Sequence, residues 1–440
     1  MNSRELAFKV LVDIESNNNY SNISINKHFK NIDISNNERG LATEIIYGVV
    51  EKKIYLDYII DKLSKIKVQK LSNYVKIFLR MGIYQIVFLD ISDYASVNET
   101  VNLAKKYDKK SSGFVNAILR NLIRNKDEIL KIDAENENMY YSIKYSYSPW
   151  MIKTFIKDFG KEFTEDLLEA NNEKPNLYIR VNTLKITREE LMKELDKIGI
   201  KSYKVNDIEE ALRVENLKNI ENNDLFKKGF FTIQDISSMI VGKVMNPNKN
   251  SRVLDLCSAP GGKTTHIATL MENTGEVVSR DIFDHKLKLI KNSVDRLGLT
   301  NVKIEKSDAS IIDKNIIENF DYVLCDVPCS GLGIIKRKPE IKYKSKEEIK
   351  DLPKLQYDIL ENASKYLKVG GVLIYSTCTI LDSENISNVY KFLENNKNFE
   401  LSKINEVNVD LENQENGYLK IYPNIHNMDG FFIAKLKKVR

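Results

Sequence analysis

The sequence predicts a multidomain chain with three parts. They are an all-α domain over residues 1–135, a small α+β module over residues 145–240, and an α/β domain with a doubly wound sheet over residues 241–440. Three observations carry this prediction. Apolar residues recur at helical spacing in the first part, strands and helices mix in the second, and regular strand–turn–helix units begin at Arg252.

The composition is that of a soluble globular chain, with 42% hydrophobic and 29% charged residues among 440. An uninterrupted apolar run of about 18 residues does not occur, so a membrane span is not expected. The start, Met1 to Phe8, lacks the apolar core of a signal peptide, and we expect a cytoplasmic protein. A net charge of +5 permits a nucleic-acid partner without requiring one.

Cysteine and histidine are scarce, with four of each. Four cysteines in a chain of this length do not suggest a disulfide framework. Cys325 and Cys329 are spaced like metal ligands, but no histidine lies near them, so we expect no metal site. The cysteines are still compatible with a role as a thiol nucleophile.

The first part reads as a helical bundle with one basic side. Leu56, Ile59 and Ile60 form one apolar stripe, and a second stripe runs from Val115 to Leu122. The opposite faces carry cationic residues: Lys105, Lys106, Lys109, Lys110, Arg120 and Arg124. These charges indicate either a solvated face or an RNA-facing surface, and their pattern alone does not separate the two.

A break at Tyr145 to Trp150 separates this bundle from the α+β module. In the module, Leu177 to Thr183 alternates like a half-buried strand, and Gly229 to Ile233 forms another. Between them, Arg188 to Ile198 is an amphipathic helix with Thr187 as its N-cap.

The last part repeats short apolar strands separated by helices, which indicates a doubly wound parallel sheet. The expected strands are Val253–Leu256, Glu276–Ser279, Val302–Glu305, Tyr322–Cys325 and Val372–Tyr375, with helices at His285–Leu297 and Lys354–Leu367. In such sheets, ligands bind at the carboxyl ends of the strands.

The end of the first strand in this domain predicts a nucleoside cofactor. A glycine-rich turn allows close backbone approach and opens a helix. The turn contains Cys257, Ser258, Ala259, Pro260, Gly261, Gly262 and Lys263. Asp281 ends the second strand and suits ribose hydroxyls, while Asp308 follows the third and suits an adenine amino group. S-adenosylmethionine fits better than NAD, because chemistry-bearing residues follow in the next strands.

Those residues are two thiols and a carboxylate. Cys329 and Cys378 follow the fourth and fifth strands, and Asp326 lies beside Cys329. This set suits chemistry at C5 of a cytosine, a poor nucleophile. A thiolate that adds to C6 turns the ring into an enamine, whose C5 attacks an electrophilic methyl group. The residues alone leave open which cysteine attacks.

At these motifs the chain resembles the RNA (cytosine-5) methyltransferases, and within them the bacterial 16S rRNA enzymes of the RsmB/Sun type. The resemblance rests on Ser258–Thr264, Asp326–Gly333 with Arg337–Glu340, Ser376–Thr379 with Glu384–Asn385, and Gly430–Ile433. Upstream, Arg180–Leu184, Gln234–Ser238 and a NusB-like helical start extend it over nearly the whole chain.

The resemblance implies roles for these residues. Cys378 is then the nucleophile, Cys329 assists proton removal and product release, and Asp326 stabilises the adduct. Residues 257–263 with Asp281, Asp308 and Asp326 would bind S-adenosylmethionine in a Rossmann-like methyltransferase domain. The implied partner is 16S rRNA or the assembling small subunit, bound by a monomer.

Two other functions are compatible with the sequence. One is a non-catalytic RNA-binding assembly factor with a vestigial methyltransferase domain, against which both cysteines and the intact cofactor loop speak. The other is a methyltransferase that acts on transfer RNA or DNA. Methyl transfer to defined nucleic acids would distinguish all three.

Overall fold

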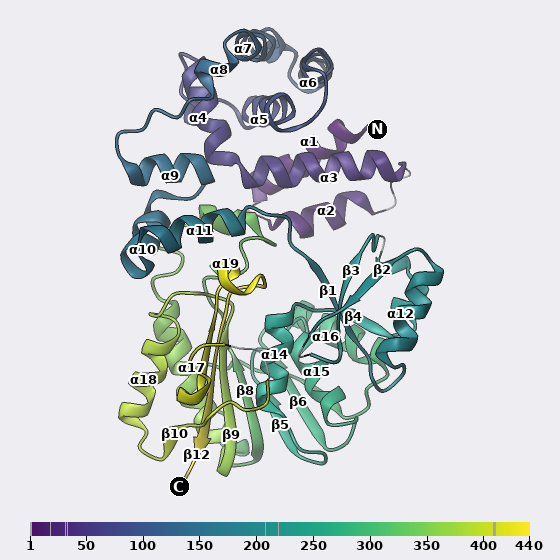
Figure 1. Ribbon diagram of the computed structural model, residues 1–440, viewed down its shortest axis with the longest axis vertical. Coiled ribbons are helices and arrows are strands. Elements are labelled where there is room, and N and C mark those ends of the chain that lie inside the picture. Colours follow the sequence, from purple (N-terminus) through teal and green to yellow (C-terminus); the bar gives the residue numbers. More distant parts are fainter. Residues whose placement is uncertain are drawn as a thin grey trace. The chain divides into compact units, whose positions relative to one another are not determined.

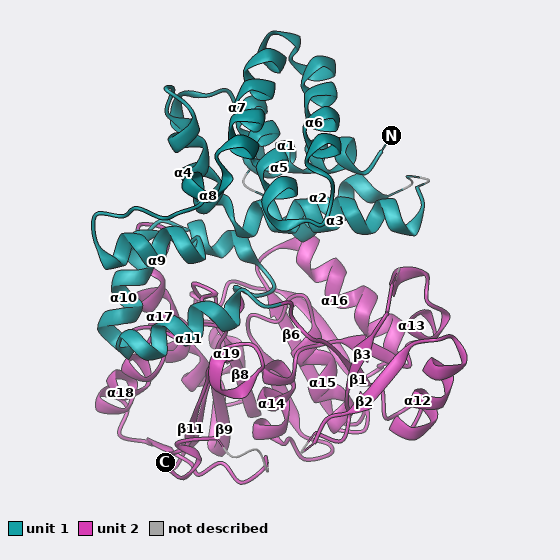
Figure 2. Ribbon diagram, turned by 45° about the horizontal axis from the view of Figure 1, so that its top comes forward, with its two compact units in different colours: residues 1–173, 335–346 teal, residues 174–334, 347–440 magenta. Residues whose placement is uncertain are grey.

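The computed structural model describes residues 2–17, 19–30, 32, 34–206, 208–218, 220–407 and 411–440. The chain forms two compact units (Figure 2). Unit 1 contains Met1–Glu173 and Ile335–Lys346, and unit 2 contains Lys174–Ile334 and Glu347–Arg440. Among the described residues, no helix has both the length and the apolar character that crossing a bilayer requires.

Unit 1 is built from helices, as its apolar stripes predict. Leu56, Ile59, Ile60, Val115 and Leu122 are all buried in one core. Serine side chains before α3, α5 and α6 accept hydrogen bonds from free N–H groups of the first turns, which starts these helices sharply. The helices are α1 Ser3–Asn17, α2 Ser21–Phe29, α3 Asn36–Glu51, α4 Lys53–Leu63, α5 Asn73–Phe88, α6 Asp93–Tyr107, α7 Ser112–Arg124, α8 Lys126–Ile129, α9 Glu137–Tyr145, α10 Pro149–Phe159 and α11 Lys161–Asn171.

Unit 1 also holds a segment from far along the chain, Ile335–Lys346. A short 3₁₀ helix, Pro339–Tyr343, packs there against α3. The carboxylate of Glu340 accepts a hydrogen bond from the backbone N–H of Ser21 at 2.7 Å. The Lys342 side chain is fully buried and reaches the carbonyl of Tyr145. Because burial disfavours its charge, the pKa of Lys342 is lowered to about 7.

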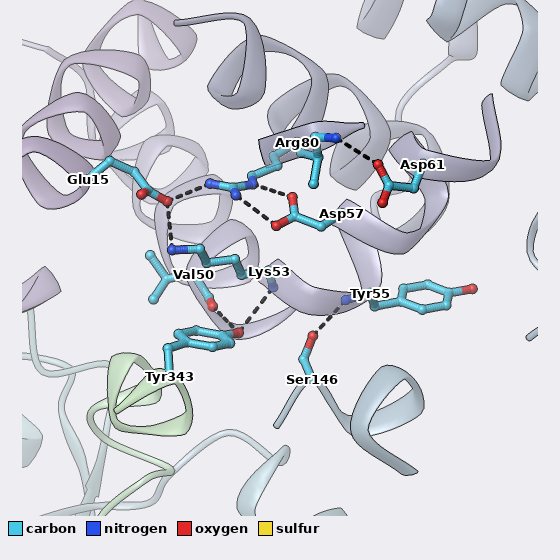
Figure 3. Close-up of polar contacts among 10 residues, drawn as sticks. Glu15, Val50, Lys53, Tyr55, Asp57, Asp61, Arg80, Ser146 and Tyr343 are labelled. Carbon is cyan, nitrogen blue, oxygen red and sulfur yellow. Dashed lines mark hydrogen bonds and ion pairs between the residues drawn. The ribbon is translucent and has the colours of Figure 1, made fainter. Parts of the chain in front are cut away.

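An ionic cluster lies next to this segment (Figure 3). The guanidinium of Arg80, 4% exposed, binds both carboxylate oxygens of Asp57 at 2.7 and 2.8 Å and also pairs with Glu15. Glu15 in turn pairs with the ammonium of Lys53 at 2.9 Å, and the backbone N–H of Lys53 donates to the hydroxyl of Tyr343. Ion pairs therefore join helices α1, α4 and α5, and each charged group of the cluster has an oppositely charged partner.

Unit 2 begins with a small antiparallel sheet of strand order β2-β3-β1-β4. Its elements are β1 Leu177–Val181, α12 Arg188–Lys197, β2 Lys201–Lys204, β3 Ala211–Glu215, α13 Asp224–Lys227 and β4 Phe231–Ile233. The predicted N-cap is confirmed, because the Thr187 side chain accepts from the N–H of Glu190 while the Glu190 side chain reaches back.

A larger sheet with strand order β10-β12-β9-β8-β5-β6-β7 follows (Figure 1). Its strands are β5 Arg252–Asp255, β6 Glu276–Asp281, β7 Val302–Lys306, β8 Phe320–Asp326, β9 Leu367–Thr377, β10 Phe399–Leu401, β11 Tyr418–Ile421 and β12 Phe431–Lys438. The helices are α14 Ile236–Met245, α15 Gly262–Leu270, α16 Asp284–Leu297, α17 Leu352–Tyr366, α18 Ile386–Asn395 and α19 Pro423–His426.

The three-part fold class is confirmed, with one correction to the sheet. Strands β5 to β9 are parallel, but β12 pairs antiparallel with β9, and β10 and β11 pair antiparallel with β12. The sheet is therefore mixed rather than wholly parallel. Antiparallel strands need no long crossover, and only the short α19 separates β11 from β12, so the strand–turn–helix pattern does not continue there.

Both faces of the larger sheet are covered, which fixes its register. Val253 and Leu324 point to the face covered by α14, α15 and α16, whereas Leu254 and Val323 point to the face covered by α17 and α18. A shift by one residue would exchange these faces. The carboxyl ends of β5, β6, β8 and β9 consequently meet at one edge.

Candidate functional site

The glycine-rich turn connects β5 to α15 at that edge. Gly261 has a φ of 100°, a conformation that favours glycine, and it lets the chain turn directly into the helix. The turn is fastened to the end of β6, because the Ser258 backbone N–H and hydroxyl both donate to the carbonyl of Arg280 at 2.9 and 2.8 Å. The first-turn N–H groups of α15 thus lie at the sheet edge.

Asp281 lies beside this turn, as the sequence predicts. Its carboxylate is buried and accepts hydrogen bonds from the backbone N–H groups of Ala259 at 3.3 Å and Phe283 at 3.2 Å. Asp308 lies after β7 and is held differently. Its carboxylate accepts from the N–H and the hydroxyl of Ser310, at 2.9 and 2.7 Å, which closes a local turn.

Asp255, at the end of β5, is a residue that sequence reasoning missed. It is fully buried, and one of its oxygens accepts a hydrogen bond from the Thr264 hydroxyl at 2.6 Å. Its other oxygen has no partner among the described atoms. Burial raises the pKa of Asp255 to about 7. Its position directly before the glycine-rich turn is the signal that would have found it.

Cys257 also lies in this turn and packs against the apolar core between the sheet and α17. Burial raises the pKa of its thiol, so it stays protonated.

Asp326 and Lys263 form an ion pair at the centre of the edge. The Lys263 ammonium lies 2.7 Å from one carboxylate oxygen of Asp326, and the Ser376 hydroxyl donates to the other at 2.7 Å. Burial opposes the charge of Lys263, but the Asp326 carboxylate outweighs it and raises the pKa of Lys263. Residues from the start of α15 and from the ends of β8 and β9 therefore converge here.

The two thiols meet beside this pair. The Sγ atoms of Cys329 and Cys378 lie 3.1 Å apart, although the residues belong to different loops. The backbone N–H of Gly333 donates to the carbonyl of Cys378 at 2.9 Å, which ties the loops together. The hydrogen bond between the two thiols and burial both raise the pKa of Cys329 well above its usual range.

The α+β module supports the glycine-rich turn through Arg180, which sequence reasoning assigned no role. Arg180 is 2% exposed, and its guanidinium donates to the carbonyl of Gly262 at 2.8 Å and the hydroxyl of Thr265 at 3.0 Å. It also contacts the side-chain amide oxygen of Gln234. Burial lowers the pKa of Arg180 to about 9. The module thereby fixes the start of α15.

Unit 1 carries a basic groove between α6 and α7 with a volume of about 690 Å³. Three of the predicted cationic residues line it, namely Lys105, Arg120 and Arg124. Tyr94, 77% exposed, also lines it. A basic groove with an exposed aromatic ring suits a nucleic-acid strand, which offers phosphates and stacking bases.

Three segments of the chain match known protein families. Residues 242–437 match the 16S rRNA methyltransferase RsmB/F family, residues 1–124 the NusB family, and residues 147–221 an RsmF/B-like ferredoxin-like domain. A Bacillus subtilis relative, "probable ribosomal RNA small subunit methyltransferase B", is 36% identical over 99% of this chain and 98% of its own.

Solved structures show the same likeness. The crystal structure of PH0851 superposes with a TM-score of 0.86 at 27% identity, over 100% of this chain and 99% of that one. NSun6 from Pyrococcus horikoshii, crystallised with SFG, gives a TM-score of 0.60 at 27% identity, over 66% of this chain and 97% of that one. The chain therefore belongs to the RsmB/F family of 16S rRNA methyltransferases, in the form that carries a NusB-type helical domain.

Proposed function

We propose that the protein methylates C5 of a specific cytosine in 16S rRNA, with S-adenosylmethionine as the methyl donor and a covalent cysteine–C6 adduct on the path. The observation that carries the proposal is the 3.1 Å approach of the Cys329 and Cys378 sulfurs beside the Lys263–Asp326 pair. Two thiols and a carboxyl in one place match the nucleophile, the base and the acid that this chemistry needs.

The residues at the sheet edge fit S-adenosylmethionine. The unpartnered buried oxygen of Asp255 offers an acceptor, the buried carboxylate of Asp281 suits ribose hydroxyls, and Gly261 leaves room for close approach. Residues 257–263, Asp281, Asp308 and Asp326 would line the cofactor. When bound, S-adenosylmethionine supplies the electrophilic methyl group. SFG, found with NSun6, is an analogue of this cofactor.

The cysteines divide the remaining chemistry. The Cys378 thiolate adds to C6, and a proton delivered or held at N3 by Asp326 leaves an enamine whose C5 accepts the methyl group. Once Cys378 is bonded to C6, its thiolate charge no longer raises the pKa of Cys329, so the Cys329 thiol releases its proton to solvent and the resulting thiolate takes the proton from C5. The electron pair of that C–H bond re-forms the C5–C6 double bond and expels the Cys378 thiolate. The Lys263 ammonium keeps Asp326 oriented through both halves.

The substrate base has to leave its stack to reach this edge, which is easiest in a loop or single strand of RNA. The groove between α6 and α7 supports a role of residues 1–135 in RNA affinity, with residues 145–240 linking them to a catalytic domain over residues 241–440. We propose that the protein acts as a monomer in the cytoplasm, on 16S rRNA or the assembling small subunit.

The test is methyl transfer from labelled S-adenosylmethionine to 16S rRNA fragments, transfer RNA and duplex DNA, followed by digestion to nucleosides. We expect label in 5-methylcytidine from 16S rRNA alone. Label in transfer RNA or DNA instead would show that this nucleic acid, and not 16S rRNA, is the substrate. Binding of 16S rRNA without any transfer would favour the assembly-factor function.

A further inference from the structure

One buried carboxylate connects the two loops that carry the thiols. Glu384 lies just before α18 and is 1% exposed. Its side chain reaches the loop after β8 as well as the loop after β9. It contacts the residue that follows each cysteine, Ser330 and Thr379, rather than the sulfur atoms.

On the Cys329 side, the contacts hold both neighbouring residues. The carboxylate of Glu384 accepts from the backbone N–H of Ser330 at 2.9 Å and from its hydroxyl at 2.5 Å. The side-chain amide of Gln356 donates to Glu384 at 2.8 Å and to the carbonyl of Pro328 at 2.9 Å. Cys329 therefore lies between two anchored residues.

The Cys378 side mirrors this arrangement. The Thr379 hydroxyl lies 3.3 Å from the Glu384 carboxylate. The adjacent Asn385 accepts from the Thr377 hydroxyl at 2.5 Å and donates to the carbonyl of Thr379 at 2.9 Å. Cys378 is thus also held from both sides, and Glu384 is the member of the Glu384–Asn385 pair that contacts both loops.

The donors around Glu384 favour a charged acceptor. Ser330, Gln356 and Thr379 present N–H and O–H groups to its carboxylate, and hydrogen bonds to a charged acceptor are stronger than those to a neutral amide, so an amide in its place would hold the two loops more weakly. The hydrogen bond between the two thiols, burial and the charge of Cys378 raise the pKa of Cys329, and the charge of Glu384 raises it further.

We propose that Glu384 is a positioning residue, whose carboxylate sets the separation of Cys329 and Cys378 so that both reach one pyrimidine ring. The inference rests on the proposed cysteine chemistry. A shift of about 1 Å in reacting groups costs roughly 10²-fold in rate. One side chain common to both loops keeps their spacing while substrate enters.

The test measures the spacing without RNA. The full-length protein is equilibrated in glutathione buffers, where oxidised glutathione takes the two thiols to a Cys329–Cys378 disulfide and is itself reduced to two thiols. Mass spectrometry gives the fraction oxidised. We expect Glu384→Gln to lower the equilibrium constant about tenfold, which raises the reduction potential by about 30 mV. Asp382→Asn, two residues away in an exposed pair with Lys420, should match wild type.

Single-turnover methyl transfer is the second readout, and we expect a loss of about 100-fold in Glu384→Gln with unchanged S-adenosylmethionine affinity. Should Glu384→Gln not fold, Ser330→Ala removes one donor, and we expect a fall of about threefold in the disulfide constant. If Glu384→Gln has the wild-type disulfide constant, the positioning role is overturned; the same holds for Ser330→Ala if that is the variant measured.

The disulfide constant is measured without RNA, so it tests the positioning role independently of methyl transfer. If the wild-type protein transfers no methyl group, that result overturns only the proposed function.

Discussion

The hydroxyl of Tyr343 donates to the carbonyl of Val50 over 2.6 Å within unit 1 (Figure 3). Tyr343 follows Cys329 by only fourteen positions in the numbering, yet its partners belong to α3 and α4. The helical unit therefore contains part of the segment that matches the methyltransferase family. Removing residues 1–130 would strip Tyr343 and Glu340 of their partners, so point substitutions test the helical unit more cleanly than deletion.

The first prediction concerns the groove between α6 and α7. Arg120→Ala with Arg124→Ala should weaken binding of single-stranded 16S rRNA fragments and reduce its salt dependence, because up to two phosphates lose their cations. Each lost contact lowers the slope of log affinity against log salt by about 0.7. Filter binding over a salt series measures this. Lys70→Ala, an exposed cation outside the groove, is the control. An unchanged slope would identify the groove as solvated surface.

The second prediction concerns the ribose contact. Asp281→Ala should weaken S-adenosylmethionine binding by about 1.5–3 kcal/mol, because a charge-assisted hydrogen bond is lost. Calorimetric titration measures the affinity. Asp284→Ala removes an exposed carboxylate three residues later, paired with Lys306, and should bind normally. Wild-type affinity in Asp281→Ala would take Asp281 out of the cofactor site.

The third prediction concerns the buried carboxyl of Asp255, whose pKa rises from 3.8 to about 7 on folding. Between these values the folded chain holds a proton that the unfolded chain releases. The contribution of Asp255 to the free energy of unfolding is therefore full below pH 4 and falls as the pH rises to 7. The fall is at most about 4 kcal/mol.

Asp255→Asn removes this dependence, since an amide does not titrate. In urea unfolding at pH 5 and pH 8, the free energy of unfolding of the variant, relative to that of wild type, should be higher at pH 8. Asp295→Asn, in an exposed pair with Lys291, should show no such gain. A constant difference between Asp255→Asn and wild type would mean that the carboxyl ionises normally in the folded chain.

The sequence predicts those features that depend on local patterns, and it does not predict roles that depend on contacts between residues far apart in the chain. The strand ends at Asp281, Asp326 and Cys378 follow from alternation and turn residues within short windows. The roles of Arg180 and Glu384 do not, because each depends on buried hydrogen bonds to residues dozens of positions away. A buried polar residue has no periodic signature, so only the folded chain reveals what it satisfies.

The last prediction separates the two thiols. Cys378→Ala should abolish turnover and form no covalent RNA adduct, because the group that attacks C6 is gone. Cys329→Ala should still permit attack and methyl transfer but stall release, so an adduct accumulates and migrates slowly on a denaturing gel. Excess reductant should not dissolve this adduct, because its bond is a thioether. Adduct in Cys378→Ala and none in Cys329→Ala would exchange the roles, and an active double variant would remove the covalent path, since each thiol serves only one half of the reaction.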